Sequence, residues 1–201
     1  MTEFALVVPI LIIMFVGVAD FARVFNAGLI IEAAARDAAE HAAQEYLANP
    51  PGDPADNAAT RLSTAAPPGV PAYYDGLHAD AAKVACAETR QLPNSDYQSG
   101  SGTCATWPVV GVCIHDQAEP AGHCGGQITG FPWPYPAECS QMNGPWPDPP
   151  GNGERWVEVR LCYKFTSLLN LPLFSLGDFY LERTRVFTIP CYFATGFGAC
   201  A

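Results

Sequence analysis

A group of cysteine and histidine residues in the middle of the chain has the side chains that bind zinc. Cys113 and His115 are separated by a single residue. His123 and Cys124 follow eight residues after His115, and Cys139 lies further along. Structural zinc sites usually take their ligands from pairs spaced C-x₂₋₄-C and H-x₃₋₅-H, and this spacing fits neither pattern. We therefore expect no metal and no other cofactor at these residues.

The cysteines as a set indicate a different chemistry. The chain holds eight of them, none forms a CxxC pair, and all follow the apolar N-terminal segment in a region rich in proline and glycine. An even set in such a region is typical of a disulfide framework formed in an oxidising compartment. Oxidised cysteines neither bind metal nor act as nucleophiles. The eight are Cys86, Cys104, Cys113, Cys124, Cys139, Cys162, Cys191 and Cys200.

The sequence lacks other signs of catalysis or of nucleic-acid binding. It contains no phosphate-binding loop and no GxSxG or HExxH motif. Carboxylate pairs such as Asp53 and Asp56 are typical of a solvated surface. Twenty acidic residues against ten basic ones give a net charge of −10, which argues against a nucleic-acid partner because phosphate binding needs clustered lysine and arginine. We expect the protein not to be an enzyme.

Residues 1–49 are predicted to form one long helix with two different halves. Residues 4–19 carry no charge, Glu3 precedes them and Pro9 lies among them. The second half is dense in alanine and ends at Asn49, because the prolines after it disfavour helical geometry. At about 1.5 Å per residue the rod is roughly 70 Å long, about twice what a bilayer core requires.

Three interpretations of the apolar half compete. A cleaved signal peptide needs a basic start, whereas this chain has Glu3 there. A membrane anchor that runs into a stalk explains the apolar residues but not the alanines. A pilin-type helix lies in the membrane first and later packs against copies of itself. It explains both halves, because small residues such as Ala35 and Ala39 let helix backbones approach closely. Pro9 is expected to kink or loosen the helix, since it removes one hydrogen bond.

Two segments resemble a known family. EFALVVPILIIMFVGVADFARVF, continuing into EAAARDAAEHAA, resembles the N-terminal signature of TadE-family pilin-like proteins, which belong to the Tad (tight adherence) type IV pili. WVEVRLCYKFTSLLNLPLFSLGDFYLERTRVF resembles the two amphipathic strands of that family and their apolar connection. The middle of the chain shows no such resemblance. The residues that we predict to act in subunit assembly are Glu3, Phe4, Pro9, Gly17, Asp20, Arg23, Ala35 and Ala39.

The resemblance implies an assembly mechanism. A prepilin peptidase cuts the precursor after a glycine, and an acid near the new end neutralises the amine of a neighbouring subunit; Glu3 takes that place here. An unpaired carboxylate in apolar surroundings is expensive, and a nearby ammonium offsets the cost. The family's acid is usually the fifth mature residue. Either a leader and two mature residues lie ahead of Met1, or this protein skips that processing, and we favour the first alternative. The implied partners are copies of the chain in a helical homopolymer, the inner membrane before assembly, the peptidase and the pilus assembly machinery.

Residues 50–201 are predicted to form a disulfide-rich globular region outside the cell. Short helices are expected at 55–66 and 78–91. The stretch 93–153 holds too many prolines and glycines for regular structure, and its aromatic residues and cysteines favour a stapled loop region instead. Residues 154–192 are predicted to be hairpin-like.

The hairpin prediction comes from period-two alternation of apolar and polar residues in 155–165 and 180–192. We expect an antiparallel pair of strands that brings Cys162 near Cys191, which makes a bond between them our guess. Eight cysteines allow 105 pairings, and the sequence does not choose among them. The connection between them, SLLNLPLFSLGD, is apolar, so we expect a neighbour or a membrane to cover it.

The sequence therefore predicts an α+β protein in which a long pilin-type helix precedes a loop-rich, disulfide-stapled region with a small antiparallel sheet. The leading hypothesis is a structural subunit of an extracellular filament that serves adhesion or surface attachment. A minor TadE-like pilin that primes or caps a pilus of another pilin is the alternative within this class. A membrane-anchored extracellular adhesin or binding module is the alternative from another class.

Overall fold

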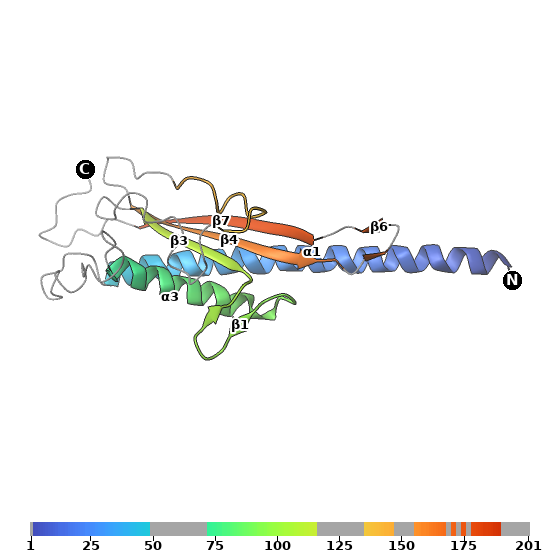
Figure 1. Ribbon diagram of the computed structural model, residues 1–201, viewed down its shortest axis with the longest axis horizontal. Helices are drawn as coiled ribbons and strands as arrows, with labels where there is room; N and C mark the ends of the chain where they lie inside the picture. Colours follow the sequence, from blue (N-terminus) through green and yellow to red (C-terminus); the bar gives the residue numbers. More distant parts are fainter. Residues whose placement is uncertain are drawn as a thin grey trace, which may run out of the picture.

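The computed structural model confirms an α+β fold in which one long helix lies along an antiparallel sheet (Figure 1). The helix extends well beyond the sheet at its N-terminal end, so the molecule is a globular body with a protruding rod. The residues that the structure describes are 2–48, 72–115, 135–146, 155–167, 170–171, 174–175 and 178–189.

The long helix is α1, Thr2–Ala48. Its 47 residues correspond to a length of about 70 Å at 1.5 Å per residue. Pro9 lies inside the helix and does not end it. Leucine, methionine and alanine favour helix formation at many positions, and the absence of glycine between 29 and 48 leaves the second half uninterrupted.

The sheet has three antiparallel strands in the order β3-β4-β7. The long strands β4, Trp156–Thr166, and β7, Asp178–Thr188, pair along their whole length and are the two strands of the expected hairpin. Strand β3, Val109–His115, pairs with the other edge of β4. It lies within 93–153, where we predicted no regular structure, so that prediction was wrong for this segment. Its run VVGVCIH is buried on both faces, which offsets the local excess of proline and glycine.

The second described helix also differs from the prediction. It is α3, Ala72–Glu88, followed by a 3₁₀ turn, η1, at Thr89–Gln91. It therefore begins six residues before the predicted 78, because Tyr74 and Leu77 provide a buried first turn. A small ladder of β1, Tyr97–Gln98, and β2, Thr103–Cys104, follows. The helix predicted at 55–66 lies outside the described residues.

The main core lies between the sheet and a layer made of α3 and the second half of α1. Ala35 and Ala39 are 0% and 1% exposed there. In this structure the two side chains therefore pack within their own subunit, whereas the sequence predicts that they pack between subunits. Their small size instead lets α1 approach α3 and the sheet within one chain. The alanines buried in this seam are Ala34, Ala35, Ala38, Ala39, Ala42 and Ala43.

The other face of the sheet is covered by the loop 135–146. A disulfide from Cys139 to Cys162 joins this loop to β4, with a Cα–Cα distance of 5.8 Å. We expected Cys162 to lie near Cys191 and to pair with it. That pairing was wrong, because Cys162 is bonded to Cys139. The loop passes over β4, which places Cys139 within bonding distance of Cys162.

A second disulfide joins α3 to β2, between Cys86 and Cys104. Cys113 is also disulfide-bonded, with a partner outside the described residues. None of the described cysteines is free. The described cysteines are thus structural staples, as the sequence predicts.

Candidate functional site

The N-terminal half of α1 is an apolar rod, which we define as residues 7–19. Its large side chains project on all sides of the helix, and Phe15 is 73% exposed. The helix contains a stretch that is long and apolar enough to cross a membrane. Burial of one such side chain contributes about 1.5–3 kcal/mol, so the rod in water would carry an unfavourable free energy on the order of 10 kcal/mol. The exposed large side chains of the rod are Val7, Ile10, Leu11, Ile12, Ile13, Met14, Phe15 and Val18.

Four of the predicted assembly residues lie on this half of the helix. Pro9 is exposed. A side chain added at Gly17 would meet no atom within 4 Å. Glu3 and Phe4 are helical, but their side chains lie outside the part of the molecule that the structure describes. The rod therefore leaves Pro9 and Gly17 free to contact another molecule.

Asp20 and Arg23 have a different place, at the point where α1 meets the sheet. Asp20 is 6% exposed and accepts hydrogen bonds from Arg23, at 3.2 Å, and from the hydroxyl of Ser167, the residue after β4. The guanidinium of Arg23 lies over the ring of Phe165, 5.3 Å from its centroid. These contacts are within one subunit. They pin the helix to the sheet where the apolar rod begins.

A second ion pair lies near this junction, across the last pairs of β4 and β7. Lys164 contacts Asp178 at 2.7 Å. The hydrogen bond to Asp178 raises the pKa of Lys164, and the same bond lowers the pKa of Asp178. Both groups stay charged at neutral pH. We name Asp20, Arg23, Lys164 and Asp178 the charged collar.

Beyond the collar, toward the C-terminus of α1, a shallow groove lies between the helix and β7. Phe21, Phe25 and Leu29 line it from the helix, and Leu181 and Arg183 line it from the strand. The three helix side chains are more than half exposed. The apolar surface of the rod thus continues along one side of the globular body.

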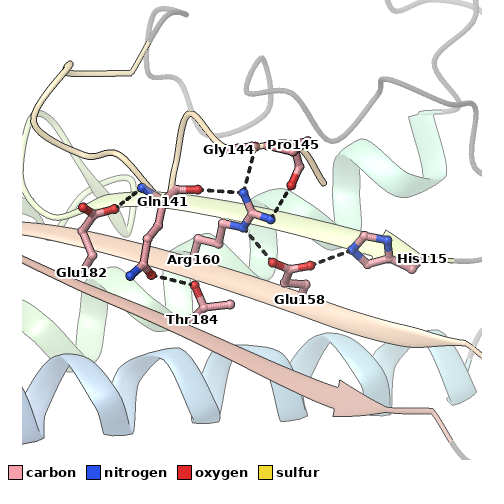
Figure 2. A network of polar contacts seen from close by, with 8 residues as sticks. All are labelled: His115, Gln141, Gly144, Pro145, Glu158, Arg160, Glu182 and Thr184. Carbon is pink, nitrogen blue, oxygen red and sulfur yellow. Dashed lines mark hydrogen bonds and ion pairs between the residues drawn. The ribbon is translucent and has the colours of Figure 1, made fainter. Parts of the chain in front are cut away.

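A buried polar network occupies the outer face of the sheet (Figure 2). Glu158 is 4% exposed. One carboxylate oxygen lies 3.1 Å from Nε2 of His115, and the other accepts a hydrogen bond from Nε of Arg160 at 2.7 Å. Burial alone would raise the pKa of Glu158, but the bonds to His115 and Arg160 outweigh it and lower that pKa. The His115 ring stacks on Trp156.

Arg160 connects this network to the loop 135–146. Its guanidinium donates to the carbonyl oxygens of Gln141, Gly144 and Pro145 at 2.7–3.0 Å. It also lies over the ring of Trp146, 3.9 Å from the centroid. The five N–H groups of an arginine suit this multiple role. The network therefore clamps the loop to β4.

Strand β7 holds the same loop from the other side. The carboxylate of Glu182 accepts hydrogen bonds from the backbone amides of Ser140 and Gln141, at 3.0 and 2.6 Å. Thr184 donates to the side chain of Gln141. The loop is thus tied to both long strands, in addition to its disulfide. The polar groups of this network have structural partners, and we assign it a structural role.

Three of the five candidate zinc ligands lie in the described part of the chain, and each of them has another partner. Cys113 is disulfide-bonded, and His115 contacts Glu158. Cys139 is bonded to Cys162. Among the residues that the structure describes, no cluster of three potential metal ligands is present; His123 and Cys124 lie outside them.

The sequence did not single out Ser167, Glu158 or Arg160. A serine at a strand end is unremarkable in sequence, and a charged residue on a strand usually marks a solvated face. The available signal was Glu158 and Arg160 two residues apart on a strand whose neighbours on both sides are apolar or aromatic. That pattern favours paired charges on a covered face.

The structure has an apolar helix that protrudes from an α+β body and packs its second half on an antiparallel sheet, an arrangement that fits a pilin-like protein. Residues 1–40 match the family of TadE-like proteins. This match confirms the resemblance at the N-terminus, and together with the apolar helix it fits a Tad pilin-like protein, a structural class with no enzymatic activity ascribed to it. Comparisons with curated proteins and with solved structures found no match.

Proposed function

We propose that this protein is a structural subunit of a Tad-type pilus. Its apolar rod would lie in the inner membrane before assembly and in the filament core afterwards. The observation that carries the proposal is the division of α1. Its second half is committed to its own subunit, whereas the rod has exposed side chains on every side. A bilayer and a bundle of identical rods are the two environments that bury such a surface all round.

The globular body would coat the outside of that filament. Disulfides and the loop clamp make it a preformed unit, so assembly requires no refolding of the body. Prepilin peptidase and the pilus assembly machinery are the partners that this role requires. Adhesion or surface attachment is the function that we propose for the filament.

The direct test is to shear surface appendages from cells and to identify their main component. A subunit of the filament appears as the dominant band and in regular fibres. Its presence at filament tips or in trace amounts would favour a minor pilin that primes or caps another pilus. Recovery only from membranes, as a monomer, would contradict the proposal and favour an anchored binding module.

Glu3 provides a residue-level test of the assembly step. It is the only charged residue among residues 1–19, and its burial in a bundle requires a counter-charge. We expect Glu3→Ala to reduce fibre yield strongly without changing the melting of the globular body. Asp37→Ala, an exposed acid on the same helix, is the matched control. Normal fibres from Glu3→Ala would remove charge neutralisation from the mechanism.

A further inference from the structure

The β4–β7 hairpin continues past the collar as a small uncharged tip. Strand β5, Asn170–Leu171, pairs antiparallel with β6, Phe174–Ser175. We name these four residues the β5–β6 tip. The connecting stretch 167–177 contains no charged residue and five leucines. In Figure 1, β6 lies further along the long axis, toward the N-terminus of α1, than the start of β7.

The root of this tip is fixed to α1 at a defined level. Ser167, the residue after β4, donates a hydrogen bond to the buried carboxylate of Asp20. Thr166 at the end of β4 bonds to Asp178 at the start of β7. Asn94 braces the same strand end, because its side chain donates to the carbonyl of Lys164. The tip therefore starts at the charged collar.

The rod starts at the same collar. From Asp20 toward the N-terminus, α1 carries no charge before Glu3, and its side chains are exposed. The rod and the stretch 167–177 thus both begin at the level of the charged collar. Both are uncharged, and both extend from the collar toward the N-terminus of α1. A charged boundary followed by apolar surface is the pattern of a protein that enters a bilayer, because a charged group in hydrocarbon costs several kcal/mol.

We propose that the β5–β6 tip inserts into the same lipid bilayer as the rod and forms a second, shallow membrane contact. This inference rests on the membrane-inserted state of the proposed function. The whole connecting stretch 167–177 has 11 residues, so each half of it reaches at most about 17 Å, which is less than a hydrocarbon core of about 30 Å. The tip therefore enters one leaflet and does not span the membrane.

Lipid, and not a second copy of the chain, is the occupant that the geometry favours. The tip and the rod belong to one chain and are joined through Ser167 and Asp20. Whenever the rod is in the bilayer, the tip is held at the surface of that bilayer, before any neighbour is present. Two anchors at a fixed spacing would also set the orientation of the globular body on the membrane.

Photo-crosslinking of the full-length protein tests the proposal. A benzophenone amino acid is placed at Phe174 or at Leu171, and the protein is reconstituted in vesicles of phosphatidylethanolamine and phosphatidylglycerol. We expect irradiation to give phospholipid adducts at one or both positions, detected by mass spectrometry. The control position is Val186, which is 56% exposed on β7 and far from the collar; it is expected to give no lipid adduct.

Three outcomes are informative. Lipid adducts at the tip support the proposal, provided that the variant melts as the natural protein does. Adducts only with a second copy, or none at either position, overturn it. The same probe at Phe15 separates this inference from the proposed function. If Phe15 gives lipid adducts and the tip gives none, only the tip inference fails; if Phe15 gives none, membrane insertion itself fails.

Discussion

Glu158 accepts bonds from His115 and Arg160 at a position from which water is largely excluded. A buried ion pair adds little net stability compared with an apolar pair of similar volume, but the removal of one partner is costly because the other charge is left uncompensated. We therefore expect the main effect of the network to be conformational: it fixes the position of the loop 135–146 on the sheet. Because Glu158 is ionised in this network, we expect the free energy of unfolding to depend on pH.

The pKa of folded Glu158 lies below its ordinary value. The stability that its ionised form contributes is therefore fully present above the unfolded pKa, about 4.3, and is lost as the pH falls through the folded pKa. We expect Glu158→Gln to lower the free energy of unfolding by about 2–4 kcal/mol at neutral pH. That difference shrinks in acid. Urea unfolding in detergent, followed by circular dichroism across this pH range, measures it.

The control for this prediction is Glu138→Gln, an exposed acid on the same loop. It is expected to change the free energy of unfolding by less than about 0.5 kcal/mol. A Glu158→Gln effect of equal size in acid and at neutral pH would contradict the proposed contribution of the ionised carboxylate.

Gly111 is a second residue on which the position of the loop depends. A Cβ atom at this position would lie 3.1 Å from Met142 and 3.3 Å from both Trp146 and Tyr135. We expect Gly111→Ala to lower the free energy of unfolding by about 1–3 kcal/mol, because the side chains packed over this position must shift to admit the methyl group. Gly76→Ala, on an exposed position of α3 with no atom near its Cβ, is expected to stabilise by about 0.5–1 kcal/mol. Equal effects would contradict the close packing over Gly111.

At the scale of elements, α1 performs two tasks with two different surfaces. Its alanine seam joins it to α3 and the sheet, and its rod stays outside the body. The seam depends on small side chains because two helices and a sheet meet there with their backbones close together.

Ala35→Leu tests whether the alanines pack within one subunit or between subunits. We expect this change to destabilise the globular body by about 1–3 kcal/mol or more, because the seam has no space for three extra carbons. Ala33→Leu, on an exposed position of the same helix, is the control and should leave the melting temperature unchanged. Differential scanning calorimetry in detergent compares the two. If Ala35→Leu reduces fibre yield without destabilising the body, the seam lies between subunits after all.

At the scale of the whole molecule, we expect the stability of the globular body to be independent of the residues of the rod. Phe15 is 73% exposed, so a change there should act only on what surrounds the rod. We expect Phe15→Lys to reduce membrane integration, since a lysine at the centre of a membrane helix costs about 2.5–3.5 kcal/mol. The melting temperature of the body should stay the same. Alkaline extraction of membranes and thermal melting measure the two effects.

Phe15→Leu is the matched control, because it changes size but not polarity and should remain integrated. A Phe15→Lys protein that melts at a lower temperature would contradict the separation, since it would show that the rod packs on the globular body.

The sequence by itself determined the elements whose signal is local. The charge-free run 4–19, the prolines after Asn49 and the period-two alternation in 155–165 were sufficient to predict the long helix, its apolar half and the antiparallel strands, because solvent and backbone sterics act on each segment alone. The even set of cysteines likewise predicted a disulfide framework.

Only the tertiary structure decided which surfaces meet. It paired Cys162 with Cys139, turned Ala35 and Ala39 toward their own subunit, and joined Asp20 to Ser167. Small residues serve an internal seam and an intersubunit seam equally well, and any two cysteines can pair once the chain brings them within about 6 Å at Cα. Such choices depend on contacts between residues far apart in sequence, and no local pattern encodes them.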